Sequence, residues 1–85
     1  MENMSWNELK SQRLKKIRGV SFEELVSQRL VATEDHPRIS TQRLMLYEYK
    51  GHIWVVPYVL DGAGVFLKTL YPSRKHTKKY LGRDL

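Results

Sequence analysis

The residues with the clearest capacity for chemistry lie near the C-terminal end of the chain. A hydrophobic strand pattern ends at Pro72, and a cation-rich helix pattern begins directly after it. Arg74 and Lys75 fall in the first turn of this predicted helix, where the helix dipole disfavours cations by roughly 0.3–1 kcal/mol each. Arg74 and Lys78 are four residues apart and share a helix face, and arginine can bind phosphate through two parallel hydrogen bonds. We therefore predict that Arg74 and Lys78 bind and stabilise an anion, with phosphate as the obvious candidate.

Other side chains in the same region could assist this chemistry. Lys75 and Lys79 form the neighbouring stripe of the helix. Tyr80 could donate a proton or stack on a base, and Lys68 lies on an otherwise apolar strand. Each has an ordinary alternative role: a solvated helix face for the two helical lysines, packing for Tyr80, and an outward-turned edge position for Lys68. Three further candidates for phosphate contact lie in the first basic segment: Lys15, Lys16 and Arg18.

Composition places these side chains in a small protein without disulfides. The chain has 85 residues, of which 41% are hydrophobic, so we expect a single domain over residues 1–85 with a modest core. It contains no cysteine, which excludes disulfides and thiolate zinc sites. No apolar run approaches the ~20 residues of a membrane span, and the N-terminus lacks the pattern of a signal peptide. We expect a cytoplasmic protein without a membrane partner.

The positive charge is concentrated in two segments. The net charge is +6, and ten of the fifteen Lys and Arg residues lie within residues 10–18 and 74–83. If the two segments meet in the fold, they form one positive face that suits nucleic acid or an acidic protein. The alternative is that they are two solvated helix surfaces.

The first segment predicts a helix over residues 6–18. Ser5 and Glu8 have the spacing of a capping box, and Gly19 is a natural stop because glycine adopts the left-handed conformation without a Cβ penalty. The helix periodicity predicts the following buried or marginal positions: Trp6, Leu9, Leu14 and Ile17.

A second helix is predicted over residues 21–32. Ser21 and Glu24 repeat the capping box at its start. Residues 33–42 are polar and contain a proline, so they predict a loop. The stripe expected to be buried consists of Phe22, Leu25, Val26 and Leu30.

The second half of the chain changes to a strand pattern. Residues 44–49, 53–60 and 65–71 are rich in aliphatic and aromatic side chains, and short turns at residues 50–51 and 61–64 separate them. Three strands with two short connections predict an antiparallel meander. The aromatic residues of the first two strands could stack bases, although packing under the helices is the commoner role: Tyr47, Tyr49, Trp54 and Tyr58.

Pro57 and Ser73 complete the predicted architecture. Because proline cannot donate to a strand ladder, we expect either a bulge at Pro57 or a gap in the pairing that faces its nitrogen. Ser73 should cap a basic C-terminal helix that extends to about Gly82. The fold class is therefore α+β, in which two N-terminal helices pack on a meander of three or four strands and a short basic helix follows. We expect the helices on one face of the sheet, with the other face left for a ligand or partner.

Two blocks of the sequence resemble the BrnT-type toxins. Those toxins begin with a Trp-Asp or Trp-Asn pair, a basic helix and a His-Gly-Val-Ser/Asp-Phe-Glu-Glu run. Here Trp6-Asn7 precedes a basic segment and residues 18–24, Arg-Gly-Val-Ser-Phe-Glu-Glu. Residues 73–80, Ser-Arg-Lys-His-Thr-Lys-Lys-Tyr, are similar to the closing Ala-Arg-Arg-Ala-Thr-Arg-Arg-Glu pattern of the family. The resemblance covers most of the chain, from about residue 6 to residue 80.

The resemblance implies a RelE-like fold and the toxin of a type II toxin–antitoxin pair. Members act as endoribonucleases that slow translation, and a co-expressed antitoxin neutralises them. The complex commonly represses its own operon, so operator DNA is contacted only through the antitoxin. Arg18 stands where the family usually has histidine, and Thr69, beside Lys68, stands where it often has arginine. His76 stands where the family usually has alanine, which makes it a minor candidate for an acid or base.

Metal-independent RNA cleavage is the chemistry that these residues could support. The reaction needs an acceptor for the 2′-hydroxyl proton, a donor for the leaving 5′-oxygen, and stabilisation of the phosphate charge. The sequence has no clustered carboxylates suited to Mg²⁺, no Gly-rich phosphate loop and no obvious Ser-His-Asp set. We therefore expect no cofactor and no metal. The predicted catalytic residues are Arg74, Lys78, Lys68 and Tyr80, and the predicted RNA-binding residues are Lys15, Lys16, Arg18, Lys75 and Lys79.

Two alternative functions remain open from the sequence. A non-catalytic RNA-binding module needs only the basic surface and the aromatic residues, and it predicts salt-dependent binding with intact RNA. An inactive regulatory partner would use the basic face to hold an acidic protein. It predicts little affinity for RNA and no growth arrest.

Overall fold

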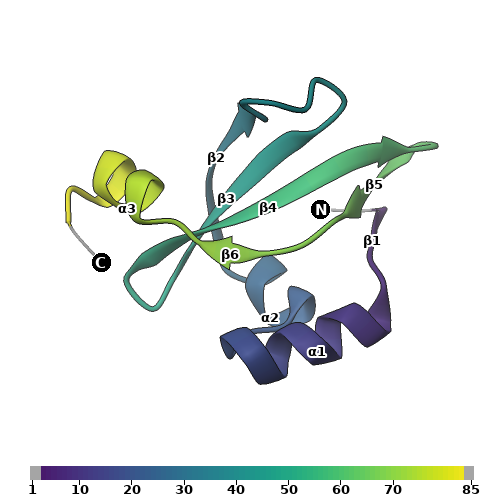
Figure 1. Ribbon diagram of the computed structural model, residues 1–85, viewed down its shortest axis with the longest axis horizontal. Helices are drawn as coiled ribbons and strands as arrows, with labels where there is room; N and C mark the ends of the chain where they lie inside the picture. Colours follow the sequence, from purple (N-terminus) through teal and green to yellow (C-terminus); the bar gives the residue numbers. More distant parts are fainter. Residues whose placement is uncertain (1–2, 84–85) are drawn as a thin grey trace.

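A mixed six-stranded sheet with helices on both faces forms the framework of the protein (Figure 1). The computed structural model describes residues 3–83, so the remaining residues of the predicted 1–85 domain lie outside the described part. The α+β class is confirmed. The strands are β1 (Met4–Ser5), β2 (Arg29–Asp35), β3 (Arg43–Tyr49), β4 (His52–Asp61), β5 (Gly64–Leu67) and β6 (Tyr71–Pro72). The helices are α1 (Glu8–Arg18), α2 (Phe22–Val26) and α3 (Arg74–Leu81).

The predicted meander is present as β3, β4 and β5. The connection between β3 and β4 is a two-residue turn, with Lys50 at φ 52° and Gly51 at φ 80°. Positive φ at both positions is the requirement of the turn whose twist matches a hairpin, and Gly51 meets it without strain. The connection between β4 and β5 is equally short, since Asp61 pairs with Gly64.

Two further strands extend the sheet beyond the meander. β2 pairs antiparallel with β3 at one edge, and β1 pairs parallel with β5 at the other. The prediction of a helix over residues 21–32 is therefore wrong after Val26, and the loop begins at residue 36 instead of 33. The physical reason is that β-branched Val31 and Thr33 suit a pleated strand, and that pairing with β3 lets Val31 and Ala32 pack against the hydrophobic side chains of the sheet.

Pro57 lies in the middle of β4, opposite an interruption in the pairing. On the side away from β3, β4 pairs with β5 from Tyr58 onward and with β6 only at Trp54 and Val55. The Lys68 backbone N–H donates to the Pro57 carbonyl across this interruption, at 2.8 Å. The predicted gap is confirmed. It also divides the single strand predicted over residues 65–71 into β5 and β6.

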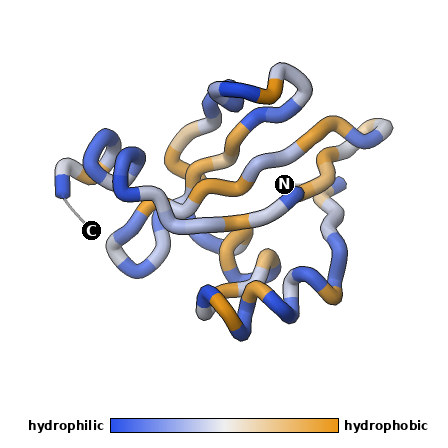
Figure 2. Tube along the Cα trace, in the orientation of Figure 1, coloured by the Kyte–Doolittle hydropathy of each residue, from blue (hydrophilic) through white to orange (hydrophobic). Residues whose placement is uncertain are grey.

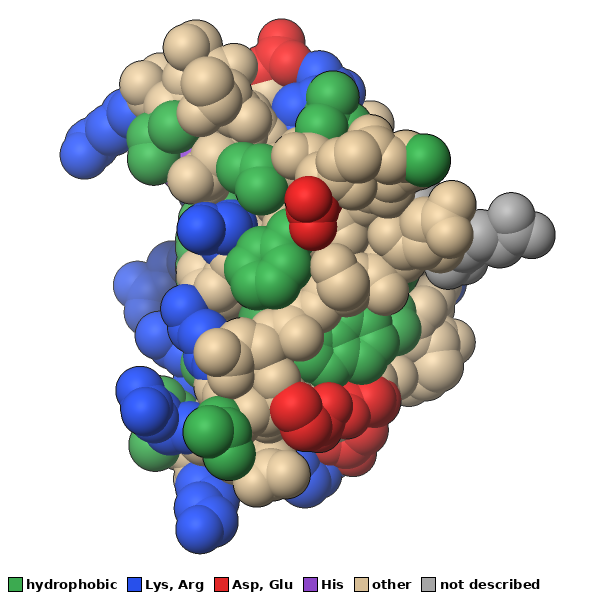
Figure 3. Space-filling view, turned by 90° about the vertical axis from the view of Figure 1, so that its right-hand side faces the viewer, with side chains coloured by type: hydrophobic (Ala, Val, Ile, Leu, Met, Phe, Trp, Pro, Cys, Tyr) green, Lys and Arg blue, Asp and Glu red, His purple; other side chains and the backbone are tan. Residues whose placement is uncertain are grey.

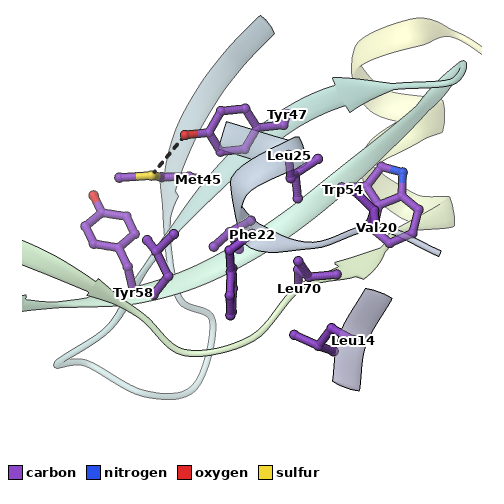
Figure 4. Close-up of a cluster of buried hydrophobic side chains, with 11 residues drawn as sticks. Leu14, Val20, Phe22, Leu25, Met45, Tyr47, Trp54, Tyr58 and Leu70 are labelled. Carbon is purple, nitrogen blue, oxygen red and sulfur yellow. Dashed lines mark hydrogen bonds between the residues drawn. The ribbon is translucent and has the colours of Figure 1, made fainter. Parts of the chain in front are cut away.

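The main core lies between the sheet and the first two helices. Phe22 and Leu25 of α2 and Leu14 of α1 are buried and converge on side chains from the strands (Figure 4). The sheet contributes mainly one alternating set, which includes most of the aromatic residues: Met45, Tyr47, Trp54, Val56, Tyr58 and Leu67. Packing under the helices is thus the role of these aromatic side chains.

The buried face of α1 differs from the predicted one. Leu9 is 74% exposed and Ile17 is 66% exposed, whereas Ser11 is fully buried. The Ser11 hydroxyl accepts the Phe22 backbone N–H (3.0 Å) and donates to the Glu23 carboxylate (2.6 Å), which fixes the rotation of α1 against the start of α2. The predicted cap at Ser5 is also wrong, because Ser5 is in β1 and Asn7 caps the helix instead.

The third helix packs on the opposite face of the sheet. Tyr80 and Leu81 contact a second cluster that contains Leu46, Ile53 and Val55, which alternate with the residues of the main core. The prediction of all helices on one face is therefore wrong. The reason is that consecutive residues are buried along the middle of β4, so both of its sides need a cover. Hydrophobic residues colour much of this strand in Figure 2.

Candidate functional site

The start of α3 is fixed to the sheet by two hydroxyl side chains. Ser73 caps the helix, since its Oγ accepts the His76 backbone N–H at 3.1 Å. The Ser73 backbone N–H donates to the carbonyl of Ile53 at 2.9 Å. Thr77 is fully buried, and its Oγ1 accepts the Ile53 N–H (2.8 Å) and donates to the Ser73 carbonyl (2.6 Å). The first turn of α3 therefore has a defined position relative to β4.

The carboxylate of Glu34 gathers three side chains of α3. Its Oε1 lies 3.2 Å from His76 Nε2, and its Oε2 lies 2.9 Å from Lys79 Nζ. The Tyr80 hydroxyl also donates to Oε2. The side chains of Glu34 and His76 are 23% and 13% exposed, so the cluster is partly shielded from water. β2 and α3, which are distant in the sequence, are joined at this point.

These contacts determine the ionisation of the cluster. The hydrogen bond from Lys79, followed by that from Tyr80, lowers the pKa of Glu34 from 4.5 to about 2. The same hydrogen bonds to Glu34 raise the pKa of Lys79 and the pKa of Tyr80. At neutral pH the cluster therefore contains a carboxylate, an ammonium group and a neutral phenol.

The hydrogen bonds of the two ring nitrogens fix the tautomer of a neutral His76. The ionised Glu34 carboxylate can only accept hydrogen bonds, so His76 Nε2 carries the proton that bridges them. His76 Nδ1 is then an acceptor, and it lies 2.7 Å from Ser73 Oγ. The Ser73 hydroxyl donates to Nδ1 while it accepts the His76 backbone N–H. The result is a continuous chain of hydrogen bonds from a serine through an imidazole to a carboxylate.

Three cations of α3 face solvent beside the hydrogen bonds that join Ser73, His76 and Glu34. Arg74, Lys75 and Lys78 are exposed, and no ion pair joins them to an acidic side chain within residues 3–83. The first turn of α3 contains no acidic residue. Lys79 differs from them because Glu34 balances its charge. Arg74, Lys75 and the free N–H groups of the first turn attract an anion at this end of the helix, and Lys78 lies one turn further along.

The remaining predicted residues lie apart from this cluster. Lys68 follows β5, and its ammonium group lies 5.6 Å from the ring centroid of Phe66. Lys15 forms an ion pair with Glu24 at 2.8 Å. Lys16 and Arg18 are exposed on α1, on the other face of the sheet from α3. In the view of Figure 3, Lys and Arg side chains follow one margin of the molecule.

From the sequence, Glu34 was not a candidate site residue, and His76 was only a minor candidate. Glu34 was assigned to a loop, where its side chain has no defined direction. As a strand residue it pairs with Leu44, which belongs to the face that α3 covers. The β-branched residues around it, Val31 and Thr33, were the available signal. Ser73 was predicted only as a helix cap, and its contact with His76 adds to that role.

Comparison with protein-family models, characterised proteins and solved structures finds no match to this chain. Within residues 3–83, no helix has the length and apolar character needed to cross a bilayer. The same part of the chain has no group of three or more His, Asp and Glu side chains arranged to hold a metal ion.

Proposed function

We propose that this protein is a metal-independent endoribonuclease, acting in the cytoplasm as the toxin of a type II toxin–antitoxin system with a RelE-like fold. The observation that carries the proposal is a set of exposed cations of α3, Arg74, Lys75 and Lys78, which form no ion pair within residues 3–83 and lie beside the hydrogen-bonded residues Glu34, His76 and Ser73. RNA cleavage through its 2′-hydroxyl needs a bound phosphate and a group that exchanges protons. Both kinds of group lie at the start of α3.

In this proposal Arg74 and Lys78 hold the scissile phosphate. Arginine can grip two phosphate oxygens, and Lys78 adds a point charge one turn further along the helix. The antitoxin would be an acidic chain that covers the same surface, because the exposed cations that attract RNA also attract carboxylates. Operator DNA would be bound only through that partner.

The direct test is cleavage of a labelled single-stranded RNA by the purified chain in the presence of EDTA. Wild type should produce fragments that end in a 2′,3′-cyclic phosphate. The Arg74→Ala/Lys78→Ala double variant should lose cleavage, because two charged contacts to phosphate are removed. The matched control is Lys16→Ala/Arg18→Ala, which removes the same charge from α1 and should retain most of the activity.

Growth of a bacterial host provides the second arm of this test. Induction of wild type should arrest growth, whereas the Arg74→Ala/Lys78→Ala variant at equal soluble yield should not. An equal loss of RNA cleavage in the Lys16→Ala/Arg18→Ala variant would show that cleavage depends on net charge and not on the α3 site. Normal growth with well-expressed wild type, together with intact RNA, would overturn the proposal.

A non-catalytic RNA-binding module is the second candidate function. It is favoured by the internal pairing of the Glu34 carboxylate, which already accepts hydrogen bonds from three side chains. This candidate predicts RNA binding that weakens steeply with salt and RNA that stays intact after long incubation. The cleavage assay above separates the two functions.

A further inference from the structure

We propose that the Ser73 hydroxyl is the group that takes the proton from the RNA 2′-hydroxyl, and that His76 and Glu34 form the relay behind it. This inference rests on the proposed function. Its basis is the chain of hydrogen bonds from Ser73 Oγ to His76 Nδ1 (2.7 Å) and from His76 Nε2 to Glu34 Oε1 (3.2 Å).

In each hydrogen bond between Ser73, His76 and Glu34, one group can donate and the other can accept. The carboxylate accepts from Nε2–H, the lone pair of Nδ1 accepts from the Ser73 hydroxyl, and Ser73 Oγ retains a lone pair toward the His76 backbone N–H. A base of this kind is oriented by a third group that also stabilises the imidazolium when it forms. Glu34 supplies that function from β2, and the contacts of Lys79 and Tyr80 hold its carboxylate in place.

Helix capping alone does not require this arrangement. In α2, Ser21 is paired with Glu24 at the third helical position, which completes a capping box. In α3 the corresponding third position is His76, whose outer nitrogen is held by a carboxylate from another element. A cap needs the serine oxygen only as an acceptor, whereas a relay also needs the imidazole and the carboxylate.

Ser73 also lies where a bound phosphate would bring its neighbouring sugar. It is half-buried at the start of α3, directly before Arg74, whose side chain is exposed. The free N–H groups of the first helical turn are directed toward the same end of the helix. A phosphate bound at these N–H groups, with Arg74 as its counter-charge, would lie close to the Ser73 cap.

The proposed cleavage step moves one proton from the RNA to His76 by way of Ser73. The RNA 2′-oxygen bonds to phosphorus, its proton passes to Ser73 Oγ, and the Ser73 proton passes to His76 Nδ1. The bond from phosphorus to the 5′-oxygen breaks, and water protonates that oxygen. The hydroxide formed from this water removes the proton from His76 through Ser73, which restores the enzyme and leaves a 2′,3′-cyclic phosphate and a 5′-hydroxyl. Ser73 is the catalytic residue of this step, whereas His76 and Glu34 are positioning residues that act through it.

Three substitutions at α3 separate the relay from the cap. Ser73→Asn keeps a capping oxygen but removes the hydroxyl, and His76→Gln keeps a residue that capping boxes accept but removes the imidazole. Ser73→Thr keeps both cap and hydroxyl. Helix content, measured by circular dichroism, and the Kd for a non-cleavable 2′-deoxy oligonucleotide should be unchanged in all three.

The decisive measurement is the single-turnover cleavage rate at saturating RNA. We expect Ser73→Asn and His76→Gln to be slower than wild type by at least 100-fold, the usual range for the loss of general acid–base catalysis, and Ser73→Thr to retain activity. Cleavage by Ser73→Asn at the wild-type rate would overturn the relay and leave the proposed function intact. Absence of cleavage by wild type itself would overturn both.

Discussion

The two basic helices of this protein both carry cations in their last turn, but their first turns differ, because α1 begins with the acidic Glu8 and α3 begins with two cations. In α1 the cations Lys15, Lys16 and Arg18 occupy the last turn, where the helix dipole favours positive charge. Lys15 additionally bridges to Glu24. In α3 the cations Arg74 and Lys75 occupy the first turn, where the dipole opposes them, and that turn contains no acidic residue.

This difference separates cations that the fold explains from cations that it does not. The charges of Lys15, Lys16 and Arg18 stabilise the helix that carries them, so their presence needs no ligand. The charges of Arg74 and Lys75 are unfavourable for their own helix, and an anionic ligand would offset this. The two basic segments of the sequence therefore differ in how their first-turn and last-turn charges act on their own helices.

The largest expected effect is on RNA binding after charge reversal in α3. Arg74→Glu/Lys75→Glu should weaken the affinity for single-stranded RNA by on the order of 100-fold or more, because two phosphate contacts are replaced by repulsion. Lys16→Glu/Arg18→Glu changes the net charge equally, from +6 to +2 after four charge units are removed, and should weaken the affinity only a few-fold. Fluorescence anisotropy at several salt concentrations measures both. Equal losses of RNA affinity in the two variants would show that the cations of α1 and α3 contribute alike to binding.

The second-largest effect is on the free energy of unfolding when Glu34 is replaced. Helix α1 has no counterpart to this carboxylate. The pKa of Glu34 is lowered from 4.5 to about 2, so its stabilising contribution is full above pH 4.5 and is lost as the pH falls to about 2. Since one pKa unit corresponds to about 1.4 kcal/mol and nearby solvent screens part of it, Glu34→Gln should lose about 2 kcal/mol at pH 7. Urea unfolding at pH 7 and pH 3 should show this difference shrinking at the lower pH. A constant difference would mean that lost packing, and not charge, is responsible.

Each helix is also fixed to the protein by one buried hydroxyl, Ser11 in α1 and Thr77 in α3. Ser11→Ala should leave the Phe22 N–H without its partner, and Thr77→Val should do the same to the Ile53 N–H. We expect each to cost about 1–3 kcal/mol in the free energy of unfolding. Only Thr77→Val should also weaken RNA binding, because it loosens α3. Weakened binding in Ser11→Ala would place part of the RNA surface on the α1 side.

The smallest effect is on stability after the same charge reversals, and its sign should differ between the helices. Arg74→Glu/Lys75→Glu places acidic groups in a first turn and should raise the free energy of unfolding by about 0.5–1 kcal/mol. Lys16→Glu/Arg18→Glu places them in a last turn and should lower it by a similar amount. Thermal unfolding at low salt is the measurement, with high salt as the control that should abolish both changes. A change of the same sign in both variants would show that net charge, and not position in the helix, governs the free energy of unfolding.

Most of the predictions that succeeded depend on local contacts, although the cap predicted at Ser5 did not. The caps at Ser21 and Ser73, the stop at Gly19 and the turn at Lys50 and Gly51 depend on residues within a few positions of each other. The exposed cations of α3 were identified in the same way. Strand β2 was not identified, because its hydrophobic residues continue a helical spacing from α2, and only the ladder to β3 decides between the two structures.

The sequence by itself determined the α+β class, the meander, the basic C-terminal helix and its cap, since these follow from hydrophobic period, turn residues and capping oxygens. Only the tertiary structure decided that α3 covers the second face of the sheet and that His76, Lys79 and Tyr80 meet Glu34. These side chains are 42–46 positions away from Glu34 in the chain. Their meeting depends on the register of β2 against β3 and on the anchoring of α3 by Thr77, and neither interaction has a periodic signature in the sequence.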